Sequence, residues 1–126
     1  MYPKEIKYTK DHEWVRVNED FAEIGITVFA EQLLGDVVFV DLPDVGEDLV
    51  QFSKFGEIES VKAVSDLFAP ISGEIIEKNI DIDKFPETIN NDPFHKGWLL
   101  RVKIKDNSEL EQLLNLKDYE KLIDEK

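Results

Sequence analysis

The sequence contains no cysteine, and this absence excludes disulfide bonds, thiolate metal sites and a cysteine nucleophile. Histidine is nearly as scarce, since only His12 and His95 occur and neither has a second histidine at helical or loop spacing. A histidine-based zinc site would need several carboxylates from distant segments, so we expect no metal site. The sequence also lacks a Gly-x-Ser-x-Gly elbow and a glycine-rich phosphate loop. We therefore expect a protein that is not an enzyme by itself.

The sequence also has no long apolar run and few positively charged residues. No apolar stretch is long enough to span a bilayer, and Met1–Glu5 has neither an apolar signal core nor an Arg- and Ser-rich amphipathic pattern. With 28 acidic residues against 15 Lys and Arg, the net charge is -13, which repels phosphate backbones and anionic membranes. These features predict a cytoplasmic protein that binds neither nucleic acid nor membranes and that meets basic patches on other proteins.

The chain has the size and composition of one globular domain. Its 126 residues are 42% hydrophobic and 34% charged, which predicts a single domain spanning residues 1–126. Alternating apolar and polar residues, or clusters of β-branched and aromatic ones, give strand character to Trp14–Val17, Ala22–Thr27, Asp36–Leu42 and Trp98–Lys105. In the last of these, alternation places Trp98, Leu100, Val102 and Ile104 on the inner face.

Two segments have helical character. Phe29–Gly35 has apolar residues at helical spacing and ends in glycine, which predicts a short capped helix. From Ser108 onward the helical period returns, with Ser108 as the predicted N-cap and Glu111 at the capping-box position. We predict one broken helix or two short helices there, packed against the sheet. Residues 81–97 have no clean periodicity and are predicted to form a long ordered loop with a turn or two.

One lysine lies between the two copies of a weak internal repeat. Gly56-Glu57-Ile58-Glu59 recurs as Gly73-Glu74-Ile75-Ile76. If the two copies are related strands, Lys62 lies between them, near an exposed reversal of the chain. Taken alone, Lys62 is an ordinary surface charge.

The string around this lysine is far more specific than the lysine itself. Glu59-Ser60-Val61-Lys62-Ala63 is followed by Pro70-Ile71-Ser72-Gly73. This resembles the lipoyl-attachment signature of the glycine cleavage H-protein family, in which Glu-Ser-x-Lys-Ala precedes Pro-x-Ser-Gly. Val28-Phe29 and Phe94 depart from residues common in that family. Further blocks that resemble the family extend over nearly the whole chain: Lys7–Val15, Ile24–Thr27, Leu34–Pro43, Ile89–Pro93 and Gly97–Leu99.

The resemblance implies a mainly β fold of the lipoyl- and biotinyl-carrier type. Two small antiparallel sheets pack as a sandwich, or flattened barrel of the hybrid-motif kind, with a short internal helix. Residues 1–105 are expected to form this core, and residues 108–126 a carboxy-terminal helical appendix. Lys62 is then expected at a tight, rigid hairpin, because a modifying enzyme needs the ε-amine at a fixed and exposed point.

The resemblance also implies a cofactor and a set of site residues. Lipoate is expected on Lys62 as N6-lipoyl-lysine, and the cofactor rather than the chain supplies the reactive disulfide. Glu13 and Asp66 occupy motif positions that imply contacts to the loaded arm. Trp14 is expected in the core and His12 in a local hydrogen bond. Recognition of the lysine by a modifying enzyme is expected to involve its neighbours Glu59, Ser60, Val61 and Ala63.

In function, the resemblance implies a carrier subunit of the glycine cleavage system. Such a chain accepts the aminomethyl group of glycine from the decarboxylase (P protein) and delivers it to the tetrahydrofolate-dependent aminomethyltransferase (T protein). Dihydrolipoyl dehydrogenase (L protein) then reoxidises the arm. A lipoate ligase, or a lipoyl or octanoyl transferase, is the expected fourth partner, because it attaches the cofactor.

Other interpretations remain open at this stage. An H-like protein that relays lipoate to other enzymes would use the same lysine, and an unmodified binding module would not use it at all. A biotin carrier usually has methionines beside its lysine, whereas Val61 and Ala63 flank Lys62. An enzyme would need an acid/base pair, for which Glu57, Glu59 and Asp66 are the available carboxylates.

Overall fold

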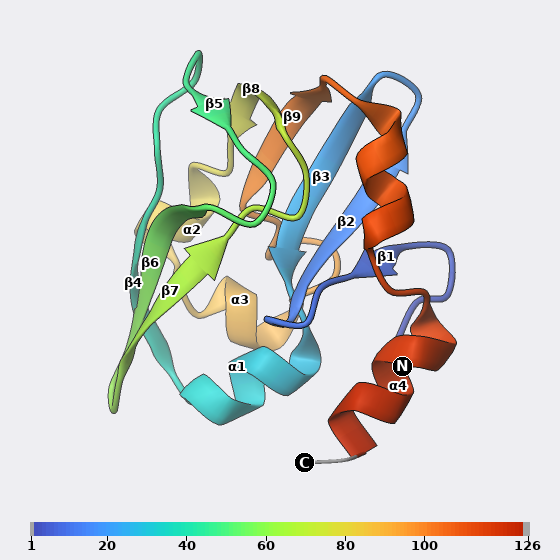
Figure 1. Cartoon of the computed structure of the whole chain (residues 1–126). Coiled ribbons are helices and arrows are strands. Elements are labelled where there is room, and N and C mark those ends of the chain that lie inside the picture. The colour runs from blue at the N-terminus through green and yellow to red at the C-terminus, as the bar shows by residue number, and fades with distance from the viewer. Residues whose placement is uncertain (1, 125–126) are drawn as a thin grey trace.

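Figure 1 shows the computed structural model of the chain, which describes residues 2–124. Its strands are β1 Lys7–Tyr8, β2 Glu13–Asn18, β3 Phe21–Ile26, β4 Val37–Asp41, β5 Asp48–Leu49, β6 Lys54–Ser60, β7 Val64–Phe68, β8 Gly73–Lys78 and β9 Leu100–Ile104. Its helices are α1 Val28–Leu34, α2 Asp81–Lys84, α3 Thr88–Asn91, the 3-10 helix Asn107–Gln112 and α4 Leu116–Asp124. The described chain is therefore mainly β with short helices.

Two antiparallel sheets form the body of the molecule. One has the strand order β1-β2-β3-β9-β8-β5, and the other has the order β4-β6-β7. In the first sheet Glu13 pairs with Ile26, and Ile24 pairs with Leu100. Strands far apart in sequence thus lie side by side, as β3 and β9 do in Figure 1. The predicted sandwich of two antiparallel sheets is confirmed.

The main core lies between the two sheets. In β3, Ala22, Ile24 and Ile26 are buried and share one face, as the period of a strand requires. Burying one such isoleucine contributes roughly 1.5–3 kcal/mol. The core continues through the large buried residues Ile58, Leu67, Ile71, Ile75, Ile82, Ile89, Leu99, Leu100 and Val102.

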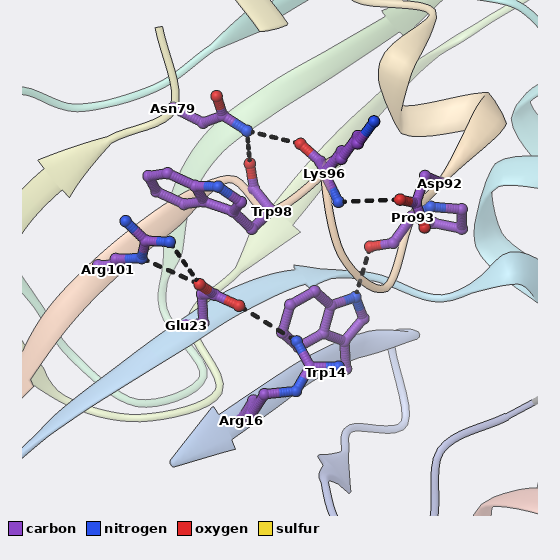
Figure 2. Close-up of polar contacts among 9 residues, drawn as sticks. All are labelled: Trp14, Arg16, Glu23, Asn79, Asp92, Pro93, Lys96, Trp98 and Arg101. Atoms are coloured by element: carbon purple, nitrogen blue, oxygen red, sulfur yellow. Dashed lines mark hydrogen bonds and ion pairs between the residues drawn. The ribbon is translucent and has the colours of Figure 1, made fainter. Parts of the chain in front are cut away.

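A second apolar group, which we call the outer cluster, covers the opposite face of β2 and β3. It comprises the buried residues Ile6, Tyr8, Trp14, Phe94 and Tyr119. The Trp14 indole N–H donates to the Pro93 carbonyl at 3.0 Å (Figure 2). A Cβ atom at Gly25 would lie 2.5 Å from the Trp14 ring, so only glycine lets the indole lie on β3. The predicted burial of Trp14 is confirmed, although in the outer cluster.

The outer cluster joins the two ends of the chain. The backbone N–H of Tyr8 donates to the Leu114 carbonyl at 2.9 Å, and the Leu114 N–H donates to the Tyr8 carbonyl at 2.8 Å. The rings of Tyr8 and Tyr119 stack with their centroids 4.5 Å apart. Segments from the start and the end of the described chain therefore hold each other against β2.

The prediction that Trp98 belongs to the inner face of the last strand is wrong. Pairing of β9 with β3 begins at Leu100, and Trp98 still belongs to a turn in which its N–H donates to the His95 carbonyl at 3.1 Å. Its ring lies on the outer side of the sheet with the Arg101 guanidinium 4.0 Å from the ring centre. Figure 2 shows Arg101 reaching on to Glu23, 2.8 Å away.

The helices predicted from the sequence are present, but one of their predicted caps is not. The short helix after β3 and its glycine cap are confirmed, because α1 ends at Gly35, whose φ is 81°. The carboxy-terminal segment is broken as predicted, into the 3-10 helix and α4. The capping box of Ser108 and Glu111 is wrong. The Asp106 carboxylate is the cap, because it accepts the Ser108 N–H at 2.9 Å and is two residues closer to the strand.

The repeated Gly-Glu-Ile sequence corresponds to two equivalent strand positions. Gly56 lies in β6 and Gly73 in β8, on either side of the turn that carries Lys62. A Cβ atom at Gly56 would lie 2.2 Å from the Asp41 carbonyl oxygen, and one at Gly73 would lie 2.4 Å from that of Lys103. Each glycine therefore lets the neighbouring strand approach closely, which is the physical reason for the repeat.

Residues 81–97 form more regular structure than a loop. They contain the single-turn helices α2 and α3, whose buried residues Ile82 and Ile89 enter the main core. Across residues 2–124, no helix is both long and apolar enough to cross a membrane. In the same part of the chain, no three His, Asp or Glu side chains are grouped so that they could hold a metal ion.

Candidate functional site

Lys62 lies in the turn between β6 and β7. Glu59 and Val64 pair across the base of this hairpin, and the Ser60 N–H donates to the Ala63 carbonyl at 2.8 Å. The Ser60 hydroxyl oxygen accepts the backbone N–H groups of Ala63, at 3.1 Å, and of Lys62, at 3.3 Å. One buried serine thus satisfies the polar groups inside the turn. The turn that carries the lysine is rigid for this reason.

The end of α1 braces the same turn from the side. The Val61 N–H donates to the Asp36 carbonyl at 3.0 Å. A Cβ atom at Gly35 would lie 3.3 Å from Cε of Lys62, so the lysine stem runs past the glycine that ends the helix. Gly35 therefore both caps α1 and leaves room for the exposed Lys62 side chain. Sequence reasoning assigned only the first of these roles to Gly35.

Asn90 fixes the position of this brace. Its side-chain amide donates to the Gly35 carbonyl at 2.8 Å and to the Glu31 carboxylate at 2.9 Å, and its oxygen accepts the Val37 N–H at 2.9 Å. One side chain from α3 therefore connects the end of α1 with the start of β4. The sequence places Asn90 in a family-like motif but gives no sign of this role, because all three partners are more than fifty positions away.

A pocket of about 250 Å³ opens beside the hairpin. Ala63, Val64 and Asp66 of the hairpin line one side, and α1 lines another. The remaining walls include apolar side chains from both sheets and polar groups from the residues before β2. The full lining is Asp11, His12, Glu13, Ile26, Ala30, Leu33, Leu34, Ile58, Ala63, Val64, Ser65, Asp66 and Leu67.

The two acids singled out in the sequence, Glu13 and Asp66, both line this pocket. They differ in environment. Glu13 is 1% exposed, and its carboxylate accepts the Thr9 hydroxyl at 2.6 Å and the Phe68 N–H at 3.2 Å. Asp66 is exposed and forms an ion pair with Lys54 at 3.1 Å. The pocket therefore has one buried and one solvated carboxyl group.

Burial dominates the chemistry of Glu13. Loss of solvation raises the pKa of its carboxyl group from 4.5 to about 8, and the hydrogen bonds from Thr9 and Phe68 oppose this rise only in part. At neutral pH the group is mostly protonated. A cation entering the pocket would lower the pKa again, because opposite charge favours the carboxylate. Glu13 is thus able to become charged when a positive group lies beside it.

The raised pKa of Glu13 makes the stability of the fold depend on pH. The folded chain holds this proton more tightly than the unfolded chain, so the contribution is fully present below pH 4.5 and is lost as pH rises to about 8. Between these two pH values, the contribution of Glu13 to the free energy of unfolding falls by up to about 1.4 kcal/mol per pH unit. We expect Glu13→Gln to remove this component, as measured by urea unfolding across the pH range.

The matched control for Glu13→Gln is Glu74→Gln, because Glu74 is exposed on β8. The control should leave the pH dependence of the wild type in place. If Glu13→Gln showed the same decline in free energy of unfolding as the control, the raised pKa would be wrong.

The neighbours of Lys62 fall into two groups. Glu59, Val61 and Ala63 are exposed, whereas Ser60 is buried. Val61 and Val64, with exposed fractions of 69% and 61%, give the tip of the hairpin an apolar surface. The recognition role of all four predicted neighbours stays a prediction, but the structure gives Ser60 a different task, which is to hold the turn.

The His12 side chain does take part in a hydrogen bond, and the partner of its Nδ1 atom is distant in the sequence. His12 Nδ1 lies 2.8 Å from the hydroxyl of Tyr119, which is 107 positions away in α4. The carboxy-terminal helix folds back against the residues that precede β2, so a distant side chain reaches His12. Its ring also lies 4.6 Å from that of Phe29 in α1, centre to centre.

Comparisons with known proteins agree with this architecture. The family model described as "Glycine cleavage H-protein" matches residues 6–126. A glycine cleavage system H protein of Carboxydothermus hydrogenoformans is 47% identical over 125 residues, which cover 99% of this chain and 96% of that protein. One from Staphylococcus epidermidis is 46% identical over 123 residues, with 98% of each chain covered.

A solved structure gives the same result for the fold. The crystal structure of a glycine cleavage system H protein from Mycobacterium marinum superposes with a TM-score of 0.83 at 39% sequence identity. The match covers 94% of this chain and 95% of that chain. The predicted lipoyl-carrier type of β-sandwich is therefore confirmed, and the chain belongs to the glycine cleavage H-protein family.

Proposed function

We propose that this chain is the lipoyl carrier of a glycine cleavage system, with the lipoyl group joined to Nζ of Lys62, and that residues 1–126 act as one carrier domain. The observation that carries the proposal is the position of Lys62, which is exposed on a turn held by Ser60 and braced by the end of α1. A lysine held in this way presents one geometry to a modifying enzyme.

The pocket beside the hairpin fits the attached group in its chemistry. Ile26, Leu34 and Ile58 offer apolar walls for an alkyl arm, and Glu13 and Asp66 offer carboxyl groups for an ammonium ion. A lipoyl group on Lys62 would supply a cyclic disulfide as the acceptor for the aminomethyl group of glycine. Beside an ammonium group in the pocket, Glu13 would lose its proton and become a carboxylate, and the apolar walls would limit contact of that group with water.

The exposed surface around Lys62 suits a carrier that visits several partners. Val61 and Val64 give an apolar tip, while the net charge of -13 favours encounter with basic surfaces. The partners are then the decarboxylase, the aminomethyltransferase and dihydrolipoyl dehydrogenase. A lipoate ligase, or a lipoyl or octanoyl transferase, would read Glu59, Val61 and Ala63 beside the lysine.

Intact-mass measurement tests the attachment directly. Protein made in a lipoate-replete host is expected to carry one lipoyl group, and peptide fragmentation is expected to place it on Lys62. Protein made in a host that lacks lipoate and cannot synthesise it is the control and should have the unmodified mass. An unmodified Lys62 in the replete host would overturn the proposal.

A further inference from the structure

The Tyr119 hydroxyl is buried behind the pocket and has two side-chain partners. It lies 2.8 Å from His12 Nδ1 and 2.8 Å from the Thr27 hydroxyl oxygen. Its ring is fully buried and stacks on Tyr8. Burial raises the pKa of Tyr119, so the group stays a neutral hydroxyl that can donate one hydrogen bond and accept others.

The two partners of Tyr119 belong to different walls of the pocket. His12 lines the pocket beside Glu13. Thr27 is the N-cap of α1, and its hydroxyl oxygen accepts the Ala30 N–H at 3.2 Å. Ala30 and Leu34 of that helix line the facing wall. A single hydroxyl from α4 therefore connects the segment before β2 with the helix across from it.

His12 also needs support because its backbone is in the left-handed region. Its φ is 72°, a conformation that costs free energy for a residue with a side chain. The Thr27 N–H donates to the His12 carbonyl at 3.0 Å, so the two partners of Tyr119 are also joined by the backbone. The Tyr119 hydroxyl completes a closed set of contacts around His12 and the start of α1.

We propose that Tyr119 is a positioning residue for the pocket, which holds His12 and the N-cap of α1 at a fixed separation and so keeps the two walls in place around the loaded arm. The role of Tyr119 in protecting the arm rests on the proposed function, whereas the contact between α4 and the two walls is independent of that function. In Figure 1, α4 lies at the same end of the molecule as α1, where the described chain ends. The carboxy-terminal helix thus belongs to the site.

The first test uses unmodified protein and compares Tyr119→Phe with Tyr8→Phe. Both changes remove one hydroxyl from the stacked pair and keep both rings, but the Tyr8 hydroxyl donates to the Pro3 carbonyl, away from the pocket. Tyr119→Phe is expected to shift the His12 ring nitrogen resonances and to speed hydrogen exchange of the Ala30 amide about fivefold, the effect of one lost hydrogen bond. Tyr8→Phe should change neither.

The second test follows loss of the aminomethyl group from loaded, lipoylated protein. Tyr119→Phe is expected to speed this loss about fivefold relative to Tyr8→Phe. Thr27→Val removes the other hydroxyl of the set together with the N-cap of α1, so the aminomethyl group should be lost at least as fast from that variant.

The outcomes separate this inference from the proposed function. If the Ala30 amide exchanged at the same rate in Tyr119→Phe and Tyr8→Phe, the contact between the walls would be overturned. If Tyr119→Phe sped this exchange but left the rate of aminomethyl loss unchanged, the positioning role would be overturned. If even the wild type takes no lipoyl group, the proposed function fails, and the exchange measurement still decides whether Tyr119 holds the walls together.

Discussion

Replacing Lys62 by alanine is expected to leave the fold intact and to abolish both lipoylation and the glycine-dependent reactions of a reconstituted system. Lys62 is exposed, and alanine keeps its backbone N–H, which is one of the groups that hold the turn through Ser60. The substitution removes only the amine to which the arm would be joined. Far-ultraviolet circular dichroism and urea unfolding should match the wild type, while intact mass shows no modification.

The control for this variant is Lys103→Ala, which removes an exposed lysine from β9. It should be lipoylated and active. Lys62→Arg provides a second control, because arginine keeps the positive charge but cannot form the lipoyl amide. Activity in either Lys62 variant would contradict the assignment of the tether, and loss of activity in Lys103→Ala would show that the assay responds to charge alone.

Replacing Gly56 by alanine is expected to produce the largest loss of stability, of roughly 2–4 kcal/mol in the free energy of unfolding. The added Cβ would lie 2.2 Å from the Asp41 carbonyl oxygen. This contact is with backbone that pairs across β4 and β6, so the two strands must separate to relieve it. Gly73→Ala should behave similarly, because its Cβ would meet the Lys103 carbonyl at 2.4 Å. Urea unfolding measures both effects.

Gly46→Ala is the matched control for the steric explanation. Its φ is 95°, but a Cβ atom there would meet no atom within 4 Å. It should therefore lose only about 1 kcal/mol, from backbone conformation alone. A loss at Gly56 no greater than that at Gly46 would show that the sheet adjusts to the extra atom and that close approach does not explain the repeat.

The features that the sequence predicted well are those set by neighbouring residues. The strand pattern of β3, the glycine at the end of α1 and the break before α4 each depend on a few consecutive residues. The reversal at Lys62 followed from the repeat on either side of it. The identification of Lys62 as a lipoyl site depended on the family resemblance, because nothing in the local pattern distinguishes it from other exposed lysines.

The features that the sequence did not predict depend on residues brought together from afar. Glutamate is usually a surface residue, and Glu13 is buried only because β2 pairs with β3 and Phe68 approaches its side chain. Asn90 and Tyr119 act across 53 to 107 positions, where no local period exists. The prediction for Trp98 failed because the alternation of apolar and polar residues already begins at Trp98, before β9 starts to pair with β3 at Leu100.

The exchange of backbone hydrogen bonds between Tyr8 and Leu114 has a consequence for how the chain folds during synthesis. Strands β2 to β9 can pair as they leave the ribosome, but Tyr8 must wait for a partner that is made more than a hundred residues later. Contacts of such long sequence separation form slowly and late. A nascent chain that stops short of Leu114 would leave the ring of Tyr8 without its stacking partner Tyr119, and this face is where chaperone binding and aggregation would compete.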